Sequence, residues 1–127
     1  MTNLPQSFEN QNYLNIETFR KNGQSVKTPV WFVQDGGAIY VRTIAGSGKV
    51  KRIKNNGRVR IAACEANGNP TGEWMPAYAT ETTDEMTADL VKKLLEKKYG
   101  KAQVRAFAAA TALSGKKYTV LKINLES

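Results

Sequence analysis

The sequence contains no histidine and a single cysteine, Cys64. Without histidine, the chain cannot form a histidine-based nucleophile triad, and it lacks the usual general base near neutral pH and the commonest metal ligand. One cysteine cannot form an internal disulfide, and a structural zinc site needs more cysteine and histidine ligands than this chain has. We therefore expect no metal site and no catalytic side chain of these kinds. If the protein is an enzyme, a bound cofactor has to supply its reactivity.

Long apolar runs are also missing. No segment approaches the roughly 20 consecutive apolar residues that a membrane-spanning helix needs. Residues 1–10 lack the basic start and apolar middle of a secretory signal. Together with the lone cysteine, these absences predict a cytoplasmic protein that does not engage a membrane.

The length and composition are those of one globular domain. The chain has 127 residues, of which 41% are hydrophobic and 24% are charged. Such a chain can build one hydrophobic core. We expect a loose polar segment over residues 1–12 and a single domain over residues 13–127.

Acidic residues are absent between Asp35 and Glu65, and the basic charge of the protein gathers there. The formal net charge is +8. Seven basic residues fall in this stretch: Arg42, Lys49, Lys51, Arg52, Lys54, Arg58 and Arg60. Such a concentration predicts an anionic partner, whether a phosphate-bearing cofactor, nucleic acid or a membrane surface, and a solvated basic face is the alternative.

Alternating apolar residues and turn signals predict six strands, over residues 13–20, 25–34, 38–43, 58–64, 73–81 and 118–125. Asn22 and Gly23 suit a type I′ hairpin turn, and Gly36 and Gly37 mark a second hairpin. Pro29 removes one hydrogen-bond donor from its strand, which places that point at a sheet edge or a bulge.

Three helices are predicted between these strands. The first covers residues 49–56, with Ser47 as its N-cap and Gly57 at the C′ position. The second starts near Thr83 and runs to Gly100, and the third covers residues 101–113. The predicted fold is mainly β with two or three helices, and a six-stranded antiparallel barrel, closed or partly closed, accommodates it best.

The segment 43–49 is the strongest candidate for a binding site. A strand ends there, two glycines bracket a serine and a helix begins, which is an arrangement that attracts phosphate. A plain turn with a capped helix accounts for this segment alone equally well. Lys27 and Thr28 are expected across a hairpin from Thr43, and Lys51 and Arg52 follow on the helix, so several cations converge on one anion.

Segments 18–23, 26–33 and 47–59 together resemble the pyridoxamine-phosphate-oxidase-like family of FMN-binding split barrels. The nearest branch is the F420-dependent one, the flavin and deazaflavin oxidoreductases. In this family arginine often stands where Gly48 lies, and Asn-Pro-Arg is more usual than Asn56-Gly57-Arg58.

The resemblance implies a six-stranded split barrel that forms a homodimer, with a phosphate-bearing cofactor, F420 or FMN, in each cleft between subunits. The matching phosphate-binding positions are Thr43, Ser47, Gly48 and Lys49, with Lys27 as the basic residue of the preceding strand. The positions that would run alongside the cofactor ring are Thr28, Pro29, Val30 and Trp31. Hydride would pass directly between this ring and a small unsaturated substrate, which requires no catalytic side chain.

Several alternatives remain open at this level. Trp31 also suits a packed core position. The choice between F420 and FMN is undecided, although the spread of basic residues suits the acidic tail of F420. A non-catalytic protein that carries a flavin or F420 is the second hypothesis. A basic nucleic-acid-binding barrel ranks third, because the aromatic residues lie on strands that also need a core.

Overall fold

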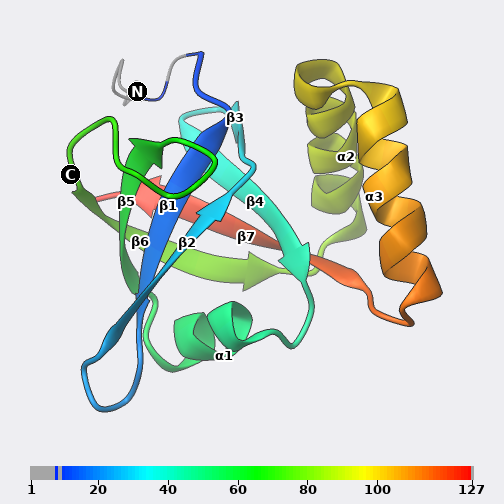
Figure 1. Ribbon diagram of the computed structural model, residues 1–127. Helices are drawn as coiled ribbons and strands as arrows, with labels where there is room; N and C mark the ends of the chain where they lie inside the picture. Colours follow the sequence, from blue (N-terminus) through cyan, green and yellow to red (C-terminus); the bar gives the residue numbers. More distant parts are fainter. Residues whose placement is uncertain (1–7, 9, 127) are drawn as a thin grey trace.

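The computed structural model of the protein describes residues 8 and 10–126. These residues form one curled sheet in which every neighbouring pair of strands is antiparallel, in the order β2-β1-β5-β6-β7-β4-β3 (Figure 1). The strands are β1 (Tyr13–Phe19), β2 (Ser25–Val30), β3 (Val33–Asp35), β4 (Ala38–Ile44), β5 (Arg58–Cys64), β6 (Met75–Thr82) and β7 (Tyr118–Leu125). The predicted mainly β fold with helices is confirmed, but the number of strands is seven and not six.

The additional strand arises because the predicted strand 25–34 divides at Trp31 and Phe32. Its first part, β2, pairs with β1, and its second part, β3, pairs with β4. The two parts therefore form the opposite edges of the sheet. Pro29 lies on the edge strand β2 as predicted, where its missing N–H leaves no gap in the interior of the sheet.

The two predicted hairpins use different turns. In the β1–β2 hairpin, the N–H of Gly23 donates to the carbonyl of Arg20 at 2.9 Å, and Gly23 has φ 88°. Asn22 does not adopt a positive φ, since Asn10 is the one non-glycine residue that does so among those described. The type I′ prediction is therefore wrong for this turn, which ends in a single left-handed glycine. In the β3–β4 hairpin, Gly36 and Gly37 both have positive φ, 59° and 84°.

Helix α1 (Gly48–Asn55) closes one end of the curled sheet and buries Val50 and Ile53, as predicted. Gly57 follows the C-cap residue Asn56 and so occupies the C′ position as predicted, but without the positive φ that glycine often has there. Gly57 instead lies against β6. The N–H of Ala79 donates to its carbonyl at 2.9 Å, and a Cβ on Gly57 would come within 3.1 Å of the carbonyl oxygen of Ala79.

Helices α2 (Glu85–Tyr99) and α3 (Lys101–Leu113) lie next to each other on one side of the sheet (Figure 1). The carboxylate of Asp84 accepts a hydrogen bond from the N–H of Thr87 at 3.0 Å, so Asp84 is the N-cap and not Thr83. A second apolar cluster joins these helices to the sheet. Its buried members are Val33, Val91, Leu95, Val104 and Val120.

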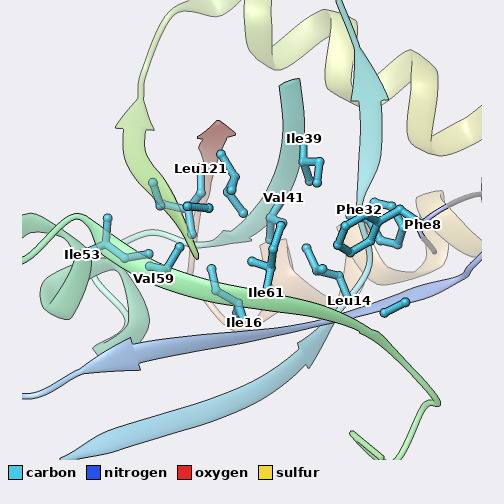
Figure 2. Packing of buried hydrophobic residues seen from close by; sticks show 14 of the residues in the cluster. Phe8, Leu14, Ile16, Phe32, Ile39, Val41, Ile53, Val59, Ile61 and Leu121 are labelled. Atoms are coloured by element: carbon cyan, nitrogen blue, oxygen red, sulfur yellow. The ribbon is translucent and has the colours of Figure 1, made fainter. Parts of the chain in front are cut away.

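The main core lies inside the curl of the sheet. Figure 2 shows Leu14, Ile16, Val41, Ile61 and Leu121 converging there from different strands. Phe8 also packs into this core, edge-on against Phe32. Most of the segment 1–12 that we expected to be loose lies outside the described residues. Among the described residues, no helix combines the length and the apolar character needed to cross a membrane.

Candidate functional site

The turn between β4 and α1 is held firmly from two sides. The N–H of Ser47 donates to the carbonyl of Ile44 at 3.2 Å, and Gly46 between them has φ 73°. The N–H of Ala45 donates to the carbonyl of Lys117 at 2.8 Å, just before β7 begins. The backbone at the start of α1 is therefore fixed relative to β4 and β7 before any ligand binds.

Ser47 occupies the N-cap position of α1, as predicted, but its hydroxyl does not cap the helix. The Ser47 Oγ atom is buried and has no hydrogen-bond partner within residues 8 and 10–126. Buried polar atoms are almost always hydrogen-bonded in folded proteins. The first-turn N–H groups of an α-helix also lack partners within the helix. An anion bound at this turn would satisfy both kinds of donor.

Two cations on α1 reach only neutral partners. Lys49 Nζ donates to Thr43 Oγ1 at 3.1 Å, and Arg52 Nε donates to Thr18 Oγ1 at 2.7 Å. Neither side chain forms an ion pair with any residue in the described part of the chain. Burial lowers the pKa of Lys49, and the nearby charge of Arg52 lowers this pKa further. Burial and the charge of Arg20 likewise lower the pKa of Arg52. Positive charge is thus concentrated here without a counter-charge.

Gly48 allows Arg52 to lie over the start of the helix. A Cβ at Gly48 would come within 2.8 Å of Arg52 Nη1, which is closer than such atoms can approach. Any side chain at this position would displace the guanidinium group. The position of the Arg52 guanidinium therefore depends on the absence of a side chain at Gly48.

A hollow of about 550 Å³ adjoins the turn. Its lining residues are Ile44, Ala45, Gly46, Ser47, Gly115, Lys116 and Lys117. Lys116 and Lys117 are not among the site residues predicted from the sequence. They reach the turn because β4 pairs with β7, with Ile44 opposite Tyr118. The pair of adjacent lysines before the last strand was the only signal that could have identified them.

The structure brings together only part of the predicted cofactor site. Its members at the turn and on the buried side of α1 are Thr43, Ser47, Gly48, Lys49 and Arg52, whereas Lys51 is exposed on α1. Lys27 lies opposite Glu17, and its Nζ is 5.3 Å from the ring centroid of Trp74. The expectation that Lys27 and Thr28 lie across a hairpin from Thr43 is wrong, because β2 pairs with β1 and not with β4.

Val30 and Trp31, also predicted as site residues, line a second hollow of about 220 Å³. Its other lining residues are Arg42, Leu95, Phe107 and Tyr118. The ring of Trp31 stacks on Tyr99, with 4.2 Å between centroids and an angle of 7° between the ring planes. Trp31 therefore packs against another aromatic side chain and also borders a hollow. Pro29 and Thr28 lie on β2, half-buried at the edge of the sheet.

The curled antiparallel sheet and the strand–turn–helix at the end of β4 define a protein of the split-barrel class. The family model described as pyridoxamine 5'-phosphate oxidase matches residues 3–127, and the chain belongs to this family. The comparison with curated protein sequences gives no match.

Solved structures of other proteins share this fold. A conserved hypothetical protein from Mycobacterium tuberculosis is 16% identical with a TM-score of 0.70, over 96% of this chain and 78% of that chain. HutZ, a haem-storage protein from Vibrio cholerae, is 13% identical with a TM-score of 0.69, over 94% of this chain and 84% of its own. A FAD-binding protein from Mesorhizobium loti is 16% identical with a TM-score of 0.63, over 96% of this chain and 84% of that chain. At these identities, the likeness establishes the fold alone.

Proposed function

We propose that this protein binds a phosphate-bearing flavin or deazaflavin cofactor at the turn between β4 and α1 and acts as an oxidoreductase on a small unsaturated molecule. The observation that carries the proposal is the buried hydroxyl of Ser47, which has no hydrogen-bond partner among the described residues. Membership of the pyridoxamine 5'-phosphate oxidase family supports the type of cofactor, as does the fold shared with a FAD-binding protein.

Each residue at the turn has a separate task in this proposal. The Ser47 hydroxyl and the first-turn N–H groups of α1 donate hydrogen bonds to the phosphate oxygens. Lys49 and Arg52 add charge-assisted hydrogen bonds, which are stronger than neutral ones. Thr43 holds Lys49 in place through its hydroxyl group. Gly48 leaves room for Arg52 and for close approach of the phosphate to the backbone.

The cofactor ring would supply the hydride chemistry when bound, so no side chain has to act as nucleophile or general base. Val30 and Trp31 are the residues that we place alongside this ring. Both F420 and FMN carry the required phosphate. Lys116 and Lys117 beside the turn favour a cofactor with further negative charge, as in the acidic tail of F420.

The second candidate is a protein that carries the same cofactor without catalysing a reaction. The haem-storage protein from Vibrio cholerae shares this fold and supports that possibility. Consumption of reduced cofactor in the presence of a panel of unsaturated substrates would favour the oxidoreductase, and binding without consumption would favour the carrier. The homodimer implied by the family belongs to the proposal and is tested by light scattering with and without cofactor.

The decisive experiment is a fluorescence titration of the purified protein with F420, FMN and riboflavin, which lacks the phosphate. We expect F420 or FMN to bind with micromolar or lower Kd, and riboflavin to bind at least tenfold more weakly. Lys49→Ala and Ser47→Ala should each weaken binding by about 10-fold or more, as expected for loss of a charge-assisted hydrogen bond. Lys92→Ala, which removes an exposed lysine of α2, serves as the control.

Two results would overturn the proposal in different ways. If neither F420 nor FMN binds, the cofactor is wrong. If one of them binds but Lys49→Ala and Ser47→Ala have no effect, the phosphate lies elsewhere. Thermal unfolding of each variant checks that a loss of binding does not come from a loss of folded protein.

A further inference from the structure

The hollow beside Trp31 lies outside the phosphate turn and has its own chemistry. Val30 ends β2 and Trp31 follows it in the connection to β3, and the other four lining residues come one each from β4, α2, α3 and β7. Its volume of about 220 Å³ is below the roughly 300–1,000 Å³ of pockets for drug-sized molecules. It therefore has room for a ligand with one or two rings.

Aromatic side chains form the walls of this hollow. The stack on Tyr99 fixes the ring plane of Trp31, and Phe107 meets Trp31 edge-on with 5.1 Å between centroids. Phe107 is nevertheless 50% exposed, which is unusual for a large aromatic side chain that only fills a core. Tyr118 is held by a hydrogen bond from Thr111 Oγ1 to its hydroxyl oxygen at 2.9 Å. These surfaces favour a flat apolar ligand.

The charged group among the residues that line the hollow is the guanidinium of Arg42. It lies 4.0 Å from the ring centroid of Tyr118 and is half-buried. Arg42 forms no ion pair with any residue of the described ranges. The side chain of Tyr118 is its hydrogen-bond partner in the hollow. The acidic side chain whose charge reaches Arg42 is Glu96, and the carboxylate of Glu96 faces Arg105, with Oε2 at 3.6 Å from Arg105 Nε. Arginine keeps its charge in proteins, so a guanidinium that has no carboxylate partner among the described residues and lies against apolar walls favours binding of an anion.

We infer that this hollow binds a small planar aromatic carboxylate, with its ring between the aromatic walls and its carboxylate on Arg42. The evidence is the combination of three aromatic walls and one half-buried guanidinium that forms no ion pair with the described residues, all in the same hollow. The inference goes beyond the proposed function because it uses none of the residues that hold the phosphate, although Val30 and Trp31 line the hollow and also border the position that we propose for the cofactor ring. It can therefore be tested on the protein without added flavin.

The probe pair is benzoate and its neutral analogue benzamide. The sequence has two tryptophans, so Trp74→Phe leaves Trp31 as the sole tryptophan reporter. In this background, we expect benzoate to change Trp31 fluorescence in a saturable way and benzamide to bind at least tenfold more weakly. Arg42→Gln should remove the difference between the two probes.

Arg58→Gln is the matched control. The Arg58 guanidinium also lies over a tyrosine ring, at 5.5 Å from the centroid of Tyr78, but it is exposed and does not line this hollow. This variant removes the same charge and should bind both probes as the parent does. Phe107→Ala changes a half-exposed wall and should weaken both probes together, so it remains informative even if Arg42→Gln does not fold.

Three results would overturn the inference. The first is the absence of saturable benzoate binding, and the second is equal binding of benzoate and benzamide. The third is an equal loss of benzoate affinity in Arg42→Gln and Arg58→Gln, which would reveal a general charge effect. None of these results bears on the phosphate turn, whose failure would appear only in the titrations with F420 and FMN.

Discussion

The side-chain hydroxyl of Tyr99 satisfies the backbone of Phe32, 67 residues earlier in the chain. The N–H of Phe32 donates to the Tyr99 hydroxyl oxygen at 3.1 Å. The hydroxyl in turn lies 3.1 Å from the carbonyl oxygen of Phe32 and 2.8 Å from that of Asn12, and it donates to either. Because these backbone groups have partners outside the sheet, the chain can leave β2 and enter β3 at this point.

Tyr99→Phe should therefore destabilise the protein. The substitution leaves the buried N–H of Phe32 without its partner, which costs about 1–3 kcal/mol in the free energy of unfolding. Urea denaturation followed by circular dichroism measures this cost. Tyr40→Phe is the control, since the Tyr40 hydroxyl makes no hydrogen bond with the described residues, and equal stability of the two variants would contradict the prediction.

The pH dependence of stability should contain a contribution from Lys98. Its Nζ donates to the carbonyl of Phe32 at 2.9 Å and lies 3.6 Å from the ring centroid of Phe32. Although much of the Lys98 side chain is exposed, its ammonium group is partly buried against Phe32, which lowers the pKa of Lys98 to about 8. Between this value and the ordinary lysine pKa near 10.4, the unfolded chain binds a proton that the folded protein has released, so this contribution to stability rises with pH.

The measurement compares wild type with Lys98→Met from pH 7 to pH 10. The difference in the free energy of unfolding, wild type minus variant, should increase above pH 8. Lys97→Met, which removes the charge of the neighbouring lysine, is the control for the loss of one positive charge. A flat or falling difference for Lys98→Met would contradict the assignment. The range ends at pH 10 because burial raises the pKa of Tyr99 to about 12, which makes stability fall as pH rises from 10 to 12.

Gly57→Ala should destabilise the fold through a backbone clash. The added methyl group would come within 3.1 Å of the carbonyl oxygen of Ala79, and the hydrogen bond from Ala79 N–H to Gly57 limits any movement of the two segments. Overpacking of this kind costs about 1–3 kcal/mol. A shift of the thermal unfolding midpoint to lower temperature is expected, and an unchanged or higher midpoint would show that β6 can move away.

Gly48→Ala, in contrast to Gly57→Ala, should not destabilise the fold. Its Cβ would meet the end of the flexible Arg52 side chain, which can move without disturbing the backbone. Alanine also favours a helix over glycine by about 1 kcal/mol. Stability should therefore be kept or increased, whereas the affinity for the phosphate-bearing cofactor should fall as Arg52 is displaced. Unchanged affinity in Gly48→Ala would separate Arg52 from the phosphate.

Local patterns predicted most of the fold. The strand 58–64, the helix 101–113 and the strand 118–125 have the predicted bounds, because alternation and helical spacing are properties of neighbouring residues. The division of the predicted strand 25–34 was not visible, since the groups that stabilise it, Tyr99 and Lys98, lie on a distant helix. Asp84 was missed as N-cap because Thr83 beside it is also a favourable capping residue.

In the candidate site too, the residues that are neighbours in the sequence were predicted, and those that come from distant parts of the chain were not. Thr43, Ser47, Gly48 and Lys49 lie within seven residues, so the sequence alone could group them at one turn. Lys27 was misplaced because we assumed that consecutive strands pair, whereas β2 and β4 lie far apart in the sheet order. Lys116 and Lys117 were missed because the pairing of β4 with β7 joins distant parts of the chain.

The division of the chain at Trp31 and Phe32 also affects how the sheet meets other protein molecules. The two edge strands are consecutive in the chain and are joined by only two residues. One of them, β3, has three residues, and the other, β2, contains Pro29. Short edge strands and prolines are features that hinder the addition of a strand from another chain. The connection that divides the predicted strand thus also protects the sheet against edge-to-edge aggregation.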